Sequence, residues 1–261
     1  GYRVWPVLEW IVLHLAELDL AVFVLPFAAL IVLVANARHL DRRLRVYAAA
    51  AASLSVWLVL EVGAFASRYS QRIEERNLFY LMPLLVIALL AWIERGQPKP
   101  PRATVAAAGV AAVLPAAIPF AHLLNITAES DTIGLQPWWY VHDVWTGDTG
   151  IGVAVVALAL GLAACFLWLP PRYAPWLPVL VALGFLCTWL PVELWTHSFP
   201  RLAKGSVAQG IGRKDKSWID AAVGRNARVG VVWAGGNNLA VWEDEFWNRS
   251  VDRVDGLGAR L

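Results

Sequence analysis

The chain has 261 residues, of which 59% are hydrophobic and 16% are charged, and its mean hydropathy is +0.54. Soluble domains contain about 45–50% apolar and about 25% charged residues, so the composition excludes a protein that is soluble along its whole length. It also excludes an intrinsically disordered chain, which would be poor in apolar residues. The 22 basic residues are nearly balanced by 20 acidic ones. With no basic surplus, we expect no nucleic-acid partner.

Long apolar runs predict a mainly α, polytopic transmembrane helix bundle within residues 18–198. Runs of about 17–22 residues are long enough to cross a bilayer. They must be helical there, because lipid offers no hydrogen-bond partner to free backbone groups. About six spans are expected, and these are Leu18–Asn36, Val46–Ala66, Leu78–Ile93, Ala103–Leu123, Gly150–Leu169 and Trp176–Trp195.

The segment before the first predicted span, residues 1–17, is apolar but interrupted by Glu9, His14 and Glu17. These three residues do not lie on one helical stripe, which indicates an interfacial or juxtamembrane segment rather than a seventh span. The chain begins at Gly1 without an initiator Met or a recognisable signal peptide. We therefore expect it to be part of a longer protein.

Basic residues in short loops predict the orientation, because such loops face the cytoplasm. The loops that contain Arg38, Arg95 and Arg172 are the cytoplasmic ones on this criterion. The loop at Arg68, the loop 125–149 and the residues after His197 would then lie outside a multi-pass cell-membrane protein. Tryptophans at the predicted span ends agree with this layout, since an indole can bury its ring and keep its N–H hydrated. These are Trp92, Trp168, Trp176 and Trp195.

Residues 199–261 have a mixed polar composition and predict a small extracytoplasmic α/β domain. We expect a helix at Asp215–Val223, a strand at Arg228–Trp233, a helix at Leu239–Trp247 and a further short strand. The strand lacks polar alternation, so both of its faces are expected to be covered. Asn125 and Asn248 each begin the tripeptide pattern of N-glycosylation acceptors.

The connection before the third predicted span is rich in candidate binding residues. Arg68, Arg72 and Arg76 are spaced by four, so one helix would place them on one face. On this topology the three arginines also lie on the extracytoplasmic side, although basic residues usually concentrate in cytoplasmic loops. Such a stripe could hold the phosphate of a lipid-linked substrate through charge-assisted hydrogen bonds. Alternatively, Glu74 and Glu75 neutralise the arginines in an ordinary solvated helix.

Other candidates lie within a span and in the outer loop. Glu61 lies inside a predicted span, where a carboxylate is costly, and it either has a function or forms a salt link to Arg68 or Arg72. The outer loop mixes aromatic rings with acids, as sugar sites do, although an interfacial aromatic belt has the same composition. Its candidate residues are Trp138, Trp139, His142 and Asp143. The possible ligands His142, Asp143 and Asp148 are too few and too irregularly spaced to predict a metal site.

The stretch ERNLFYLMPLLVIALLAWIE, from Glu75 to Glu94, resembles a segment of the polytopic GT-C-type glycosyltransferases. The similarity is to E-R-Y-L-F/Y-x-x-P-L in the family-39, protein-mannosyltransferase-like and aminoarabinosyltransferase-like branch, with Asn77 in place of the usual Tyr. The tail KSWIDAAVGRNARVGVVWAGGNNLAVWEDEFWNRSV is similar to the outward-facing domain that closes many bacterial members. The resemblance implies inverting transfer from a polyprenyl-phosphate-linked sugar, with a catalytic base upstream of this sequence. It also implies that this segment opens a transmembrane helix at the extracytoplasmic face, where the active site lies, and we expect Glu75, Arg76 and Tyr80 to be substrate-binding residues.

The sequence thus predicts the C-terminal part of an integral membrane glycosyltransferase whose partners are membrane lipid and a lipid-linked sugar, with no cofactor beyond that donor. Neither the acceptor nor the catalytic residue can be assigned. The main alternative is a non-catalytic membrane protein such as a flippase, a transporter subunit or an assembly factor, and a third is a scaffold without a ligand. A transporter is expected to show interrupted helices and ionisable residues near the bilayer midplane. The charges within the predicted spans lie near their outer ends, which favours a surface reaction.

Overall fold

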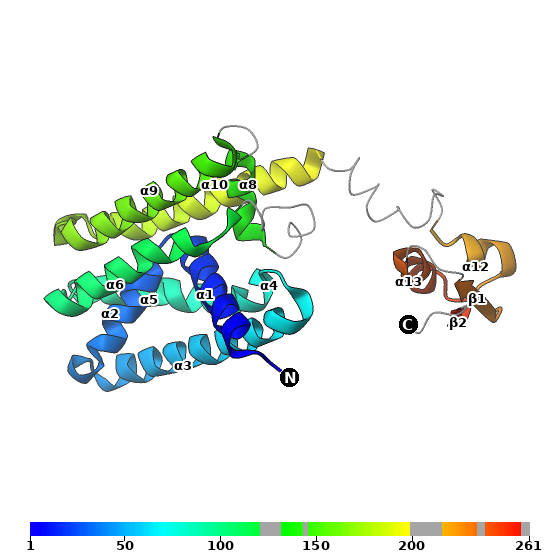
Figure 1. Cartoon of the computed structure of the whole chain (residues 1–261), viewed down its shortest axis with the longest axis horizontal. Helices are drawn as coiled ribbons and strands as arrows, with labels where there is room; N and C mark the ends of the chain where they lie inside the picture. Colours follow the sequence, from blue (N-terminus) through cyan, green and yellow to red (C-terminus); the bar gives the residue numbers. More distant parts are fainter. Residues whose placement is uncertain (121–131, 143–145, 199–215, 234–237, 257–261) are drawn as a thin grey trace. The chain divides into compact units, whose positions relative to one another are not determined.

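The structure, a computed structural model, describes residues 1–120, 132–142, 146–198, 216–233 and 238–256. The chain is mostly helical and divides into two compact units, Gly1–Val192 and Glu193–Leu261. The first unit is a bundle of apolar helices, and the second contains a small sheet (Figure 1). The unit boundary lies close to residue 199, where the composition changes.

The helices of the first unit largely follow the apolar runs of the sequence. The longer ones are α1 (Val4–Ala21), α2 (Leu25–Ala35), α3 (Arg42–Phe65), α5 (Met82–Glu94), α6 (Pro101–Val113), α9 (Gly147–Trp168) and α10 (Trp176–Ser198). Short helices and turns join them: η1 (Ala37–His39), η2 (Ala66–Ser70), α4 (Glu75–Leu78), η3 (Phe79–Leu81), η4 (Leu114–Ala117), η5 (Ile133–Leu135), α8 (Gln136–Val141) and η7 (Pro171–Tyr173).

Local sequence explains where several of these helices begin. The Asp41 carboxylate accepts a hydrogen bond from the Leu44 N–H at 3.0 Å and so caps α3. Pro83 and Pro101 lie in the first turns of α5 and α6, where the missing N–H needs no partner. Pro170, two residues beyond the last residue of α9, prevents its continuation.

Three continuous helical stretches are long and apolar enough to cross a membrane: Arg42–Ser70, Glu75–Glu94 and Gly150–Trp168. A fourth candidate exists if α1 and α2, which are bent by 112° at their junction, form one broken span. The predicted fourth and sixth spans overlap two shorter apolar stretches, which are Pro101–Ala117 and Trp176–Cys187, the first part of α10, whose side chains are described. Within the described part of the chain, length and composition therefore support three to four spans, and the count of six stays a prediction.

The first helix differs from the sequence expectation. It continues through the predicted boundary at residue 17 and ends at Ala21, and its second half, from Leu13 onward, is buried in the bundle. It crosses α3 closely (Figure 1), where a Cβ on Gly63 would lie only 2.7 Å from Cγ1 of Ile11. The chain then breaks, with φ angles of 59° at Phe23 and 64° at Val24. A left-handed conformation is rare for any side chain and strained for a β-branched one, so packing must hold this break in place.

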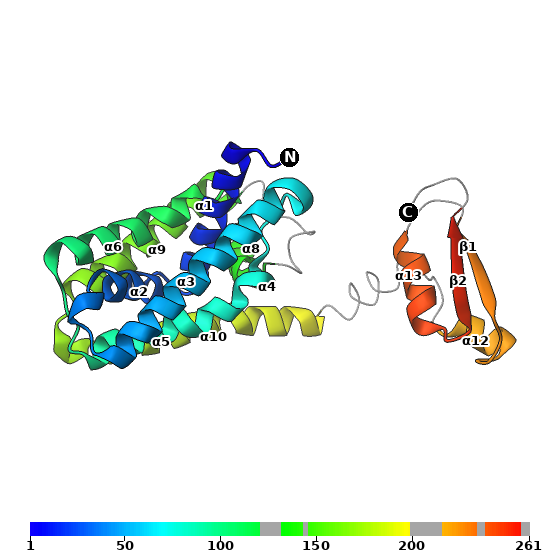
Figure 2. The same cartoon turned by 90° about the horizontal axis from the view of Figure 1, so that it is seen from below.

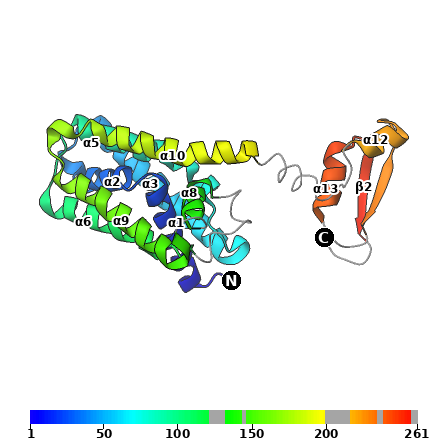
Figure 3. The same cartoon turned by 90° about the horizontal axis from the view of Figure 1, so that it is seen from above.

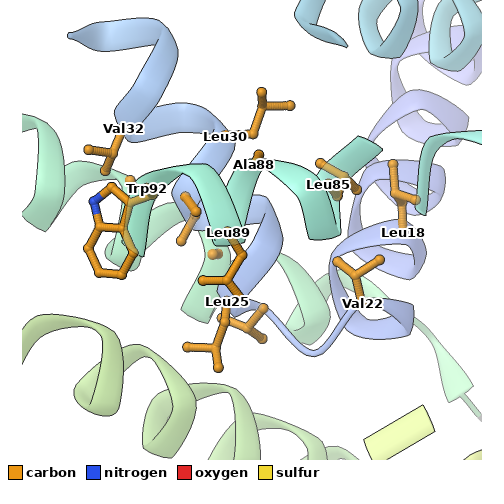
Figure 4. Close-up of a cluster of buried hydrophobic side chains, with 14 of the residues drawn as sticks. Leu18, Val22, Leu25, Leu30, Val32, Leu85, Ala88, Leu89 and Trp92 are labelled. Atoms are coloured by element: carbon orange, nitrogen blue, oxygen red, sulfur yellow. The ribbon is translucent and has the colours of Figure 1, made fainter. Parts of the chain in front are cut away.

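Apolar side chains of α1, α2 and α5 meet in the core of the bundle (Figure 4). Trp92 is fully buried there, with its ring stacked on Phe166 at a centroid distance of 4.4 Å. Its indole N–H donates to the Pro98 carbonyl at 3.1 Å. The expectation of a hydrated, interfacial Trp92 is therefore wrong, because a backbone carbonyl takes the place of water. Trp168 and Trp176 are exposed, as residues at a membrane interface would be.

The second unit is a β–α–β arrangement with an additional helix. It comprises α12 (Trp218–Val223), β1 (Val229–Trp233), α13 (Asn238–Trp247) and β2 (Val251–Gly256). The two strands pair in parallel, with Val229 opposite Val251 and Val231 opposite Val254, and α13 lies along them (Figures 2 and 3). Parallel strands need such a crossover connection, because a tight hairpin reverses the chain direction once and can join only antiparallel strands.

The order of elements in this unit agrees with the prediction, but the burial of β1 does not. Val229 and Val231 are half-buried, whereas Val232 is 59% exposed. The strand thus alternates, and the expectation that both of its faces are covered is wrong for the described residues. The reason is that α13 covers one face of the two-stranded sheet, and the apolar Val232 lies on the other.

Candidate functional site

The arginines of the predicted stripe do not share one helix face. Arg68 lies in η2, a π-helical turn that ends at Gln71, whose φ of 50° is left-handed. Arg72 follows this break, and Arg76 lies in α4. The prediction of a continuous helix is wrong because Gln71 ends it, and the break lets the chain turn from one candidate span into the next.

Glu74 brings two of the arginines together. Its Oε1 lies 3.1 Å from Nε of Arg72, and its Oε2 lies 3.8 Å from Nε of Arg76 and 3.3 Å from Nδ2 of Asn77. The Glu74 side chain is only 2% exposed, but those of Arg72 and Arg76 are 40% and 63% exposed. Arg68 instead packs over the rings of Tyr2 and Tyr69, at 5.5 and 5.3 Å.

A buried histidine ties this arginine-bearing segment to α1. Nε2 of His14 accepts the backbone N–H of Glu74 at 3.0 Å, and Nδ1 lies 2.7 Å from the Trp10 carbonyl oxygen. Because a carbonyl only accepts, the proton must be on Nδ1, and His14 is a neutral imidazole with both nitrogens bonded. The position of Glu74, and with it that of Arg72 and Arg76, is thereby fixed on the bundle.

Glu75 points inward, away from the arginines that Glu74 holds. Its Oε2 accepts the Gly134 N–H at 2.7 Å, and Gly134 lies against Ala21 of α1, one helical turn after Glu17. Glu75 is 5% exposed and Glu17 is fully buried. Neutralisation of the arginines by both glutamates, the alternative drawn from the sequence, therefore applies to Glu74 alone.

Two acids of α1 are buried without hydrogen-bond partners in the described part of the chain. Both carboxylate oxygens of Glu17 and both of Asp19 lack a partner, and both residues are 0% exposed. Sequence reasoning treated Glu17 as an interruption and did not single out Asp19. The sequence does contain a signal for both residues, because an acid within an apolar segment of a membrane protein is a functional candidate by default.

The remaining predicted site residues lie apart from this cluster or are not described. Glu61 is exposed on α3, and no ion pair joins it to Arg68 or Arg72 among the described residues. Tyr80 is 74% exposed in η3. Trp138 is half-buried against a second hydrophobic cluster, which includes Ala16 and Leu20 of α1. His142 is half-buried, while the Trp139 side chain and Asp143 lie outside the described residues.

In the described ranges, no group of three or more His, Cys, Asp or Glu residues could hold a metal ion. What the site offers is a surface with partly exposed guanidinium groups and, beneath it, a pair of buried carboxyl groups. Comparison with known proteins does not identify a family: no family model, curated protein or solved structure matches the chain. Function must therefore be argued from this geometry and from the resemblance in sequence.

Proposed function

We propose that the chain is part of an integral membrane glycosyltransferase that takes its sugar from a polyprenyl-phosphate donor. Arg72 and Arg76 would contact the donor phosphate at the extracytoplasmic surface. One observation carries the proposal: these partly exposed guanidinium groups converge on a buried carboxylate in the connection between two candidate spans. A connection between spans lies at the membrane surface, which is where the phosphate of a membrane lipid also lies.

The charge of this connection suits an anionic ligand. Three arginines lie between Ser67 and Asn77. Because Glu75 turns inward, Glu74 is the carboxylate of this segment that faces their positive charge. Guanidinium groups bind phosphate through paired hydrogen bonds, which a lysine cannot reproduce. Because Glu74 is anchored to His14, the two arginines are held in place before a ligand arrives. Such preorganisation reduces the entropy lost on binding.

Donor binding tests the proposal directly. The probe is polyprenyl phosphate, titrated into the chain in lipid nanodiscs. Loss of one charged hydrogen bond, worth roughly 1.5–3 kcal/mol, should weaken binding by about 10- to 150-fold in Arg76→Ala. Arg76→Lys should recover part of the affinity. The matched control is Arg43→Ala, which changes an exposed arginine in the first turn of α3. Equal affinity in all variants, with Arg72→Ala also silent, would refute the phosphate role.

The proposal includes six spans with the arginine surface and the C-terminal unit outside the cell. Two exposed residues, Tyr80 in η3 just before α5 and Glu94 at the end of α5, provide a paired test. In a background lacking Cys165 and Cys187, Tyr80→Cys should react with an impermeant maleimide in intact cells. Glu94→Cys should react only after permeabilisation. The reverse pattern would place the arginines in the cytoplasm, away from an extracytoplasmic donor.

Cation-coupled transport is a second candidate, favoured by the broken helix. Transporters use discontinuous helices and buried ionisable residues to form ion sites. The α1–α2 junction is bent by 112°, and the buried acids Glu17 and Asp19 immediately precede it. Proteoliposomes that contain a pH-sensitive dye distinguish the candidates. A proton or sodium flux that Asp19→Asn abolishes would establish transport, whereas a glycosyltransferase should show no flux.

A further inference from the structure

Two buried carboxyl groups, those of Glu17 and Glu75, lie where α1 packs against α4. In the described part of the chain no donor reaches either carboxylate oxygen of Glu17. Gly134 holds the Glu75 carboxyl group beside α1, because its N–H is bonded to Oε2 of Glu75 and it lies against Ala21, one helical turn after Glu17. Two ionised carboxylates are both acceptors and repel each other in an apolar interior, so their burial together is favourable only if a proton or another cation lies between them.

The surroundings of the pair are apolar and closely packed. Ala16 and Leu20, on either side of Glu17 in α1, are buried in a hydrophobic cluster. On the other side, a Cβ at Gly134 would lie 3.1 and 3.2 Å from the Glu75 oxygens and 3.2 Å from Cβ of Ala21. The peptide of Gly134 is thus pressed against the carboxyl group. A proton needs no space here, whereas a hydrated metal ion does.

Charged groups on the neighbouring elements are engaged elsewhere. On α1, His14 is neutral and bonded at both nitrogens, and Asp19 lies about 200° around the helix from Glu17. Around α4, the cations Arg72 and Arg76 contact Glu74. Arg68 of η2 packs on tyrosine rings, and η4 and η5 carry no titratable side chain. No described cation therefore compensates the pair.

We propose that Glu17 and Glu75 bind one proton between them, forming a buried proton-binding site that fastens α4 to α1. The Gly134 N–H stabilises the remaining negative charge. The site lies at the contact between α1 and α4 (Figure 1), beneath the arginines that Glu74 gathers. Proton loss would drive the two carboxylates apart and displace α4, which carries Arg76. This inference does not depend on a glycosyltransferase function.

The proton gives the stability of the bundle a definite pH dependence. Glutamates in an unfolded chain are ionised at neutral pH. Folding would thus take up a proton, and a state that binds more protons loses stability as the pH rises. The thermal midpoint of the bundle should fall with increasing pH in the parent chain. Glu17→Gln should remove this dependence, because its amide donates to Glu75 without a titratable proton.

Infrared spectroscopy of the full chain in nanodiscs tests the proposal without relying on stability. At neutral pH we expect a carbonyl band of a protonated carboxyl group that shifts in deuterated water. In an Asp19→Asn background, which removes the other buried acid of α1, Glu17→Gln and Glu75→Gln should each abolish the band, and Glu9→Gln, which changes an exposed glutamate of the same helix, should retain it. The parent spectrum alone is decisive if a variant does not fold: absence of any such band overturns the proposal.

A metal ion is the competing occupant, and the same samples exclude or establish it. If the site binds a proton, EDTA should leave the thermal midpoint unchanged. Added Mg²⁺, Mn²⁺, Ca²⁺ or Zn²⁺ should then not raise the midpoint of the parent chain more than that of Glu17→Gln. A midpoint that falls with EDTA and recovers with one of these ions, in the parent but not in Glu17→Gln, would replace the proton by that metal.

Discussion

Buried polar side chains of the two units, Asn248 in one and the acids Glu17 and Asp19 in the other, differ in their hydrogen bonding. In the C-terminal unit, Asn248 is only 1% exposed, yet all of its hydrogen-bonding capacity is used. Its amide nitrogen donates to the carbonyls of Lys216 and Asp244 at 3.1 and 2.9 Å. Its amide oxygen accepts the N–H groups of Ile219 and Asp220 at 2.9 and 3.1 Å, where α12 begins.

The two buried acids of α1 in the bundle show the reverse. Glu17 and Asp19 are more deeply buried than Asn248, and their carboxylate oxygens have no hydrogen-bond partner among the described residues. Buried polar groups are almost always satisfied in proteins, so exceptions need a reason. The comparison gives Asn248 a structural role in its unit and makes the two acids functional candidates. It also removes Asn248 as a glycosylation acceptor, because its amide is enclosed and fully bonded.

Removing the satisfied residue should have the largest effect. Asn248→Ala leaves two N–H groups and two carbonyls without their buried partner and should destabilise the C-terminal unit by about 2–4 kcal/mol. The matched control, Asn226→Ala, changes an exposed turn residue and should alter stability by less than about 0.5 kcal/mol. Hydrogen exchange of residues 229–256 in the full chain, followed against urea, measures both. Equal effects would show that the Asn248 network is not structural.

Acid should weaken the same unit. Hydrogen bonding by Ser250, joined by the Arg249 N–H and the Arg225 guanidinium, holds the pKa of the buried Asp220 carboxyl below its usual value. Since the pKa is lower in the folded unit than in the unfolded chain, the ionised carboxylate stabilises the unit at neutral pH. This contribution is lost as the pH falls through the folded-state pKa.

Protection of the β1 amides, corrected for intrinsic exchange, should therefore decrease toward acid in the parent chain. The decrease should be smaller in Asp220→Asn, which has no carboxylate to protonate. If the stability of the parent unit did not change as the pH fell below the usual pKa of an aspartate, the stabilising role of the Asp220 carboxylate would be refuted. This trend is opposite in sign to the one expected from the Glu17–Glu75 proton site, so the two units should respond oppositely to pH.

An exposed ion pair should matter much less than either buried group. Nη2 of Arg228 lies 2.6 Å from Oδ2 of Asp252, but their side chains are 81% and 50% exposed. Solvent screening and side-chain entropy limit such pairs, so Arg228→Ala should cost less than about 1 kcal/mol. The loss should shrink further in high salt. If Arg228→Ala destabilised the unit as much as Asn248→Ala does, burial would not explain the difference expected between the two variants.

The smallest effect on stability is expected where the buried group has no partner. Asp19→Asn breaks no hydrogen bond in the described structure and removes a carboxylate that is costly to bury. The thermal midpoint of the bundle at neutral pH should remain unchanged or rise. A drop comparable with that of Asn248→Ala would reveal a structural partner for Asp19 and remove it as a functional candidate.

Much of the fold follows from local sequence. The apolar runs around α3, α5 and α9 predict helices because a long apolar segment in lipid must satisfy its own backbone. The helix–strand–helix–strand order of the C-terminal unit follows from the change in composition after residue 199 and from short apolar runs between polar turns. The number of spans is less certain from composition, because α6 and the described part of α10 are shorter than their apolar runs suggest.

The arrangement of the site was decided by contacts between residues far apart in the chain. Glu74 and Glu75 are adjacent, yet His14, 60 residues away, binds the backbone of one, and Gly134, 59 residues away, binds the carboxylate of the other. Spacing alone placed the arginines on one helix, since nothing local signals the left-handed Gln71. Sequence determined which residues are helical and charged. Only the tertiary structure determined which charges reach the surface and which are buried, because burial depends on neighbours that periodicity cannot identify.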